Sequence, residues 1–259
     1  MKIKILNLNI YFYKDKIIEK KAINNFSFEF DSNNFYGIIG NNGSGKTSLL
    51  PYLNTLKFNN NESYFDNNLI NNKNKSKNKK LIKDIRKKII ITLQFPEHQI
   101  FKNTVEKEIR LLEKNFKISI NRENVIKKYK DFNFQENDIL NLNPFLMSSG
   151  EKRKHIIILA FLLEPEIIIL DEPTSGLDPI SSKYIFKKLS EYVNKDKSII
   201  VISHNLDMLY KYANYFLIMH DSHLLLSGNK SIFKNKEVFD KAKLKRPLNF
   251  LLDNLEEGN

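Results

Sequence analysis

The feature of this sequence that most constrains its fold is the octapeptide at residues 40–47, which has the spacing G-x-x-x-x-G-K-[ST]. It follows an apolar run that ends at residues 37–39, so a strand leads directly into a glycine-rich loop and then a helix. Glycines let successive backbone N–H groups turn toward a polyphosphate, and the positive end of the next helix points at the same anion. In such a loop Lys46 reaches the β- and γ-phosphates and Thr47 binds Mg²⁺. The loop therefore predicts a nucleotide site, whose cradle also includes Asn42, Gly43, Ser44 and Gly45.

Composition excludes several other kinds of site. The 259 residues are 41% hydrophobic, which suffices for a sizeable core. There is no cysteine, so disulfide frameworks and thiolate metal sites are excluded, and the five histidines show no ligand spacing. No apolar signal segment follows Met1, and the longest apolar stretch, residues 156–170, is interrupted at residues 164–166. We therefore expect neither a secretory signal nor a transmembrane helix.

Most of the formal net charge of +12 lies in one Lys- and Asn-rich segment. Residues 73–88 contain nine basic residues and a single acidic residue, Asp84. A solvated surface is the first interpretation of such a run. Contact with an anionic membrane face is the second, and nucleic acid is the third, because no aromatic side chains are interleaved for stacking. We expect no nucleic-acid partner.

Hydrophobic periodicity predicts an α/β fold. Residues 1–36 alternate apolar and polar positions, which indicates an antiparallel β layer ahead of the glycine-rich loop. Apolar runs at residues 89–93, 167–170 and 198–202 alternate with helices predicted at 147–163, 179–193 and 206–212. This alternation is typical of a parallel sheet covered on both faces.

Local patterns assign the remaining segments. A helix at residues 48–56 should follow the loop, with Pro51 in its first turn. The low-complexity segment at about residues 57–88 is predicted to be the least ordered part. Helices predicted at 105–112, 121–129 and 135–141 form a separate helical subdomain. A hairpin is predicted at 215–227, and the polar tail from Asn229 onward is predicted to be helical.

Two further candidate groups stand at the ends of predicted strands, where ligands bind in open α/β sheets. Asp171 and Glu172 follow the second apolar strand, and His204 follows the third. Asp171 is placed to share a magnesium ion with Thr47. Glu172 can polarise a water molecule that attacks the γ-phosphate, which requires a carboxylate within one water of that phosphate. A histidine by itself is usually structural, so His204 gains meaning only from the rest of the set.

Taken in order, six motifs resemble those of the ATP-binding subunits of ABC transporters, over about residues 3–228. They are residues 40–47 (Walker A), Gln94 (Q-loop), residues 147–151 (signature), residues 167–172 (Walker B), residues 175–178 (D-loop) and His204 (H-loop). The resemblance implies an α/β fold with a P-loop NTPase (RecA-like) core, an antiparallel β layer and an α-helical subdomain inserted at about residues 96–150. A helical tail, residues 229–259, would follow this ATPase domain.

The same resemblance implies an ATPase that works as a head-to-tail pair with Mg²⁺. Each ATP would lie between the Walker A loop of one chain and the signature of the other, here Ser148, Ser149 and Gly150. Gln94 would contact the metal and take part in catalysis with Lys46, Glu172 and His204. The family also stacks an aromatic ring on the base. Phe12 is favoured for that role, with Tyr13 and Tyr11 as alternatives.

Within the family, residues 94–101 and 104–106 are similar to ATPase subunits of energy-coupling-factor (ECF) transporters, in the form of the second of two paralogous ATPases. The resemblance implies import of a vitamin or a transition-metal ion. The implied partners are a second ABC ATPase, a transmembrane coupling protein and a membrane-embedded substrate-binding protein, with this chain peripheral on the cytoplasmic face. By analogy, residues 94–101 would receive a coupling helix. The rival functions are an ATPase of a conventional ABC importer or exporter and a non-transport ABC protein acting on ribosomes or nucleic acid.

The signature departs from the family pattern. Residues 147–151 read Met-Ser-Ser-Gly-Glu where Leu-Ser-Gly-Gly-Gln is usual. Ser149 adds a side chain in place of glycine, and Glu151 adds negative charge near a helix start that should meet a phosphate. Because the signature faces the partner's nucleotide, we expect the partner's site to be the weaker one and the site on Lys46, Asp171, Glu172 and His204 to be competent.

Overall fold

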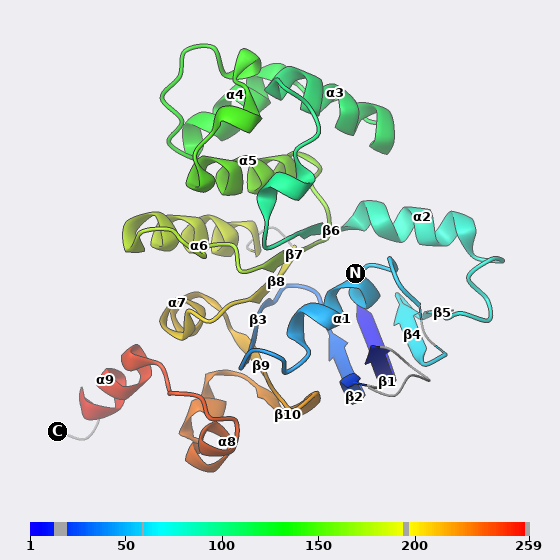
Figure 1. The fold of residues 1–259 in the computed structure, drawn as a ribbon, viewed down its shortest axis with the longest axis vertical. Helices are drawn as coiled ribbons and strands as arrows, with labels where there is room; N and C mark the ends of the chain where they lie inside the picture. Colours follow the sequence, from blue (N-terminus) through cyan, green and yellow to red (C-terminus); the bar gives the residue numbers. More distant parts are fainter. Residues whose placement is uncertain (13–19, 59, 194–196, 257–259) are drawn as a thin grey trace.

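The computed structural model describes residues 1–12, 20–58, 60–193 and 197–256. Its centre is a six-stranded sheet in the order β10-β9-β3-β8-β7-β6, in which each neighbouring pair is parallel except β10 and β9 (Figure 1). Its strands are β3 (Phe35–Gly40), β6 (Ile89–Thr92), β7 (Ile167–Asp171), β8 (Ser198–Ile202), β9 (Tyr215–His220) and β10 (His223–Gly228). The parallel sheet, its strands and the hairpin were all predicted from the sequence.

The central sheet is buried on both faces. Successive side chains of a strand point to opposite faces. Thus Ile168 and Leu170 of β7 join a core with the helices, whereas Ile167 and Ile169 join a second core on the other side. This is why the strands are nearly continuous runs of isoleucine, leucine and valine.

A four-stranded antiparallel sheet covers the second core, in the order β2-β1-β4-β5. Its strands are β1 (Ile3–Phe12), β2 (Lys20–Phe30), β4 (Glu62–Phe65) and β5 (Asn68–Ile70). The predicted antiparallel layer is confirmed by the pairing of β1 with β2.

The prediction of little order at residues 57–88 is wrong. Phe65 and Ser63 of β4 pair with β1, and the helix α2 (Lys79–Lys88) packs Ile82 and Ile85 into the second core. Two apolar residues three apart suffice to anchor one face of a helix, while its lysines stay in water. The two apolar positions are hard to recognise in the sequence because lysine and asparagine dominate the composition of this segment.

The helix after the glycine-rich loop is α1 (Lys46–Leu53), two residues earlier at its start than predicted. Gly45 adopts a left-handed conformation (φ 100°) immediately before it, so the helix begins inside the octapeptide. Pro51 lies inside the helix and not in its first turn, which corrects the sequence prediction.

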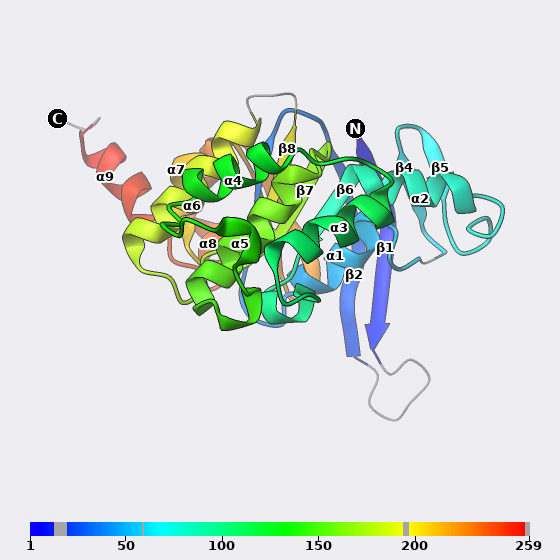
Figure 2. The ribbon, with the colours of Figure 1, turned by 90° about the horizontal axis from the view of Figure 1, so that it is seen from above.

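The helical subdomain contains α3 (Val105–Phe116), α4 (Arg122–Asp131) and α5 (Ser149–Leu162), and it covers one side of the sheet (Figures 1 and 2). The helix predicted at 135–141 is wrong. That stretch contains a short 3-10 turn at Ile139–Asn141, and a second turn follows at Pro144–Leu146. Side chains of Asp138 and Asn143 cap these turns, and such local hydrogen bonds compete with a regular helix.

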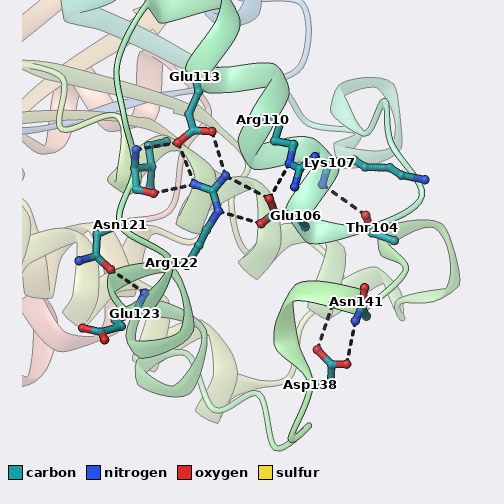
Figure 3. A network of polar contacts seen from close by, with 11 residues as sticks. Thr104, Glu106, Lys107, Arg110, Glu113, Asn121, Arg122, Glu123, Asp138 and Asn141 are labelled. Carbon is teal, nitrogen blue, oxygen red and sulfur yellow. Dashed lines mark hydrogen bonds and ion pairs between the residues drawn. The ribbon is translucent and has the colours of Figure 1, made fainter.

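Arg122 ties α3 to α4 (Figure 3). Its guanidinium contacts Glu106 at 2.7 Å and Glu113 at 2.8 Å, and Glu113 also accepts the backbone N–H of Ile120. These bonds lower the pKa of Glu113 to about 2. The network fixes the turn between the two helices.

The remaining helices are α6 (Pro179–Val193), α7 (Leu206–Tyr212), α8 (Lys236–Lys241) and α9 (Leu248–Glu256), with a 3-10 helix at Lys230–Lys234. The tail packs back on the core: Asn41 donates to the carbonyl of Ala242 (2.7 Å), and the N–H of Asn249 donates to Asp207 (3.1 Å). The helical tail agrees with the sequence prediction. Within the described residues, none of the helices has the length and apolar character needed to cross a membrane.

Candidate functional site

The loop from β3 to α1 holds Lys46 in a buried position. Its ammonium donates to the carbonyls of Gly40 (2.7 Å) and Asn41 (2.9 Å), and the side chain is 6% exposed. Burial lowers the pKa of Lys46, an effect that Glu172 and Asp171 oppose. A Cβ on Gly45 would lie 2.3 Å from the carbonyl oxygen of Ala22, so the close approach of β2 requires glycine here. The loop therefore holds the Lys46 ammonium in a fixed position.

Asp171 and Glu172 stand at the end of β7, beside that cradle. Asp171 is 2% exposed, and burial raises its pKa above the usual value. The Thr47 hydroxyl opposes this rise only in part. Burial, and next the charge of Asp171, raise the pKa of Glu172. Glu172 adopts a left-handed backbone conformation (φ 50°), and its N–H donates to the carbonyl of Ile202 (2.9 Å). The two carboxylates therefore lie between α1 and β8.

His204 approaches Glu172 from the end of β8. Its Nε2 lies 3.6 Å from Oε1 of Glu172, which is longer than a hydrogen bond. Burial and the charge of Lys46 lower the pKa of His204, so the imidazole is neutral at neutral pH and this contact is no ion pair. Ser203 donates to the other carboxylate oxygen of Glu172 (3.3 Å). Oε1 of Glu172 is buried and has no hydrogen-bond partner among the described residues.

These groups line one cavity of about 550 Å³. The sequence-predicted residues that line it are Phe12, Asn42, Gly43, Gly45, Lys46, Thr47, Gln94, Asp171, Glu172 and His204. Phe12 is 43% exposed, and Lys20 lies beside it on the paired strand. Ser44 is buried and is not among the residues that line the cavity, and its hydroxyl has no partner among the described residues. Tyr13 lies outside the described residues.

The signature residues Ser148, Ser149 and Gly150 lie outside the described lining of this cavity, at the start of α5. Ser148 and Glu151 form a capping box, in which each side chain bonds the other residue's backbone N–H. The structure therefore does not bring the signature together with the Walker A loop of the same chain.

Two residues that sequence reasoning missed hold the Q-loop. Gln99 accepts the N–H of Leu93 (2.7 Å) and donates to the carbonyl of Ile91 (3.0 Å). Arg153 of α5 donates to the carbonyls of Gln94 (3.1 Å) and Glu172 (3.0 Å). Gln99 belongs to the segment at residues 94–101 that is similar to ECF ATPases. No pattern in the sequence distinguishes Arg153 from the lysines around it.

The oxygen donors at the cradle suit magnesium. The Thr47 hydroxyl interacts with the Asp171 carboxylate and lowers its pKa, and both groups are hard ligands. In the part of the chain that the structure describes, no group of three or more His, Asp or Glu side chains could hold a metal ion by itself. A magnesium ion here would need phosphate oxygens as well, which is its usual mode of binding with nucleotides.

Comparison with known proteins agrees with this geometry. The model of the family described as ABC transporter matches residues 23–175. The chain belongs to the ABC transporter family.

Its relatives specify the branch of the family. This ABC ATPase is 34% identical over 245 residues to the energy-coupling factor transporter ATP-binding protein EcfA2 of Staphylococcus aureus, covering 92% of this chain and 83% of the relative. It is 28% identical to the structure of cbiO1 from Clostridium perfringens, part of the ABC transporter complex cbiONQ, with a TM-score of 0.74 and 98% of each chain covered.

A more distant cassette shares the fold. The dimeric post-hydrolysis structure of MJ0796 bound to ADP and Pi gives a TM-score of 0.76 at 22% identity, over 88% of this chain and 98% of that one. The expected P-loop NTPase fold, ATPase class and kinship with ECF ATPases are confirmed.

Proposed function

We propose that this ABC ATPase powers an ECF-type importer of a vitamin or a transition-metal ion. The observation that carries the enzymatic part is the single cavity that unites Lys46, Thr47, Asp171, Glu172 and His204. The similarity to EcfA2 and to cbiO1 supports the transport branch. The proposed partners are a second ABC ATPase, a transmembrane coupling protein and a membrane-embedded substrate-binding protein, with this chain peripheral on the cytoplasmic face.

Each lining residue has a proposed role in binding. Lys46, now held by two carbonyls, would bind the β- and γ-phosphates, and the cradle N–H groups of residues 42–45 would surround them. Phe12, which also lines the cavity, would stack on the adenine ring. Thr47, Asp171 and Gln94 would hold Mg²⁺, which neutralises phosphate charge when bound.

Hydrolysis would be carried by Glu172 and His204. The Glu172 carboxylate orients a water molecule and accepts its proton as the water oxygen attacks the γ-phosphorus. The bond from that phosphorus to the ADP oxygen breaks, which releases ADP and phosphate. Oε1 of Glu172, which has no partner among the described residues, would be the atom that accepts the hydrogen bond of this water once the water enters the site. His204, neutral and close to Glu172, would hold the γ-phosphate by hydrogen bonding.

Coupling to the membrane would use the surface around the Q-loop. Leu93, Phe95 and Phe101 are exposed there, and an apolar helix of the coupling protein would cover them. The second ATPase would present its signature to the cavity described above, while Ser148, Ser149 and Gly150 of this chain would face the partner's ATP.

Purification of the tagged chain from native membranes in mild detergent tests this function. The expected result is a complex with a second ABC ATPase and two kinds of integral membrane protein, and its ATPase activity should require Mg²⁺. Recovery of ribosomes or nucleic acid in place of membrane proteins would instead support the non-transport rival. Recovery with a conventional permease would favour an ordinary ABC transporter.

A further inference from the structure

Arg153 joins three parts of the site through one side chain. It lies on α5, the helix that begins with the signature, and one guanidinium nitrogen donates to two backbone carbonyls. One carbonyl belongs to Gln94 after β6 and the other to Glu172 after β7. The side chain is half-buried, and burial lowers its pKa while Glu97 and Glu172 oppose the effect. An arginine remains charged in proteins, so both bonds are charge-assisted.

The carbonyl of Glu172 belongs to a strained residue. A left-handed backbone (φ 50°) is unfavourable for a side chain with a Cβ and persists only where its surroundings hold it. The N–H of Glu172 is held by Ile202, and its carbonyl by Arg153 and by the N–H of Ser175 (3.2 Å). These bonds set the direction in which the Glu172 carboxylate leaves the backbone.

The backbone of Gln94 is likewise held by hydrogen bonds from side chains. Gln99 fixes the strand just before it by bonding Leu93 and Ile91. Beyond that point Arg153 is the side chain that bonds the Gln94 backbone. The position of Gln94 therefore depends on α5 as well as on the strand that precedes it.

We propose that Arg153 is a positioning residue that aligns Gln94 and Glu172 from the signature helix, so that a shift of α5 changes the geometry of the hydrolytic site. This inference rests on the proposed ATPase function. Arg153 lies five residues after Ser148, about 7.5 Å along the same helix. The following residues of α5, from His155 to Leu162, are all buried, so the packed core holds the helix as a single unit. Nucleotide engaged by the signature in one site is thus linked mechanically to the carboxylate of the other.

The test compares Arg153→Met, Arg153→Lys and Lys152→Met in the complete complex with its partner subunits. Arg153→Met should lower kcat for ATP about 10- to 100-fold, the loss expected when charge-assisted bonds to catalytic loops are removed, with KM and the thermal midpoint nearly unchanged. Arg153→Lys should recover part of kcat, because an ammonium keeps the charge but has a different donor geometry. Lys152, half-buried on the same helix, is the matched control and should retain full turnover.

Three results would overturn the assignment: an unchanged kcat in Arg153→Met, an equal loss in Lys152→Met, or a loss explained by a raised KM or a lowered thermal midpoint. The last would show that Arg153 only supports the fold. Failure of the proposed ECF-type function is distinguishable, because the partners that co-purify with the wild-type chain would then be a conventional permease, ribosomes or nucleic acid before any variant is compared.

Discussion

The hydroxyl of Ser148 donates to the carboxylate of Glu151 over 2.7 Å at the first turn of the signature helix. The backbone N–H of Ser148 donates to the same carboxylate oxygen (2.8 Å), and the N–H of Glu151 returns a bond to the hydroxyl (3.3 Å). Hydrogen bonds from Ser148 lower the pKa of Glu151, so the carboxylate is charged at neutral pH. The signature serine is therefore engaged by an anion at the place where a partner's phosphate should arrive.

Replacement of that charge should activate the partner's site. In Glu151→Gln the side-chain oxygen can still cap the helix, but the repulsion of a phosphate is removed. Two unit charges about 4 Å apart in a well-solvated setting interact with about 1 kcal/mol, so turnover at the partner's site should rise about 5-fold. The measurement is the ATPase activity of a complex in which the ATP site built on Lys46 and Glu172 of this chain has been inactivated, so that only the partner's site turns over. Glu123→Gln, a change of an exposed carboxylate on α4, is the control. Equal turnover in Glu151→Gln and wild type would contradict the proposed asymmetry.

The two cradle glycines should differ in their tolerance of alanine. A Cβ at Gly45 meets a backbone oxygen at 2.3 Å, whereas a Cβ at Gly43 meets nothing within 4 Å; both residues have positive φ. Gly43→Ala should therefore cost only the backbone strain, about 1–2 kcal/mol of unfolding free energy. Gly45→Ala should cost about 1–3 kcal/mol more, because backbone must move. Chemical denaturation without nucleotide measures both. A smaller loss in Gly45→Ala than in Gly43→Ala would show that β2 does not constrain the loop.

His155 predicts a loss of stability in mild acid. It is fully buried, shares a hydrogen bond with Tyr129, and burial lowers its pKa to about 3. Because the unfolded chain takes up this proton near pH 6.5 and the folded chain does not, the stabilisation is present above that pH and is lost as the pH falls toward 3. Between pH 7 and pH 5 the loss should be about 2 kcal/mol.

The pH slope of unfolding free energy isolates this effect. His155→Gln should be less stable at pH 7 but should have a flatter slope between pH 7 and pH 5. His98→Gln, a change of an exposed histidine in the short 3-10 helix Pro96–Gln99, should keep the wild-type slope. If the wild type, His155→Gln and His98→Gln lose stability with the same slope, groups other than His155 control the acid transition.

Sequence patterns predicted the parts of the fold in which chemistry and periodicity coincide. The strand before Asp171 and the strand before His204 are continuous apolar runs, and the octapeptide at residues 40–47 carries its own geometric requirement. Because parallel strands end at one edge, the convergence of Lys46, Asp171, Glu172 and His204 could be predicted.

The patterns failed where long-range contacts decide the structure. In α2 the anchoring role of Ile82 and Ile85 is visible only once a core exists to receive them. In the stretch after α4, side-chain caps at Asp138 and Asn143 replaced a predicted helix. Arg153 is one of several basic residues on α5, and its two carbonyl partners are 59 and 19 residues away in sequence.

The central claim is that the site on this chain hydrolyses ATP through Glu172. The most direct measurement is the steady-state ATPase rate of the purified complex with Glu172→Gln in this chain, beside the equivalent change in the partner ATPase. Loss of the carboxylate that accepts the proton should lower turnover by about 100-fold or more, with ATP still bound, and the change in the partner should have the smaller effect. Unchanged turnover in Glu172→Gln would contradict the account.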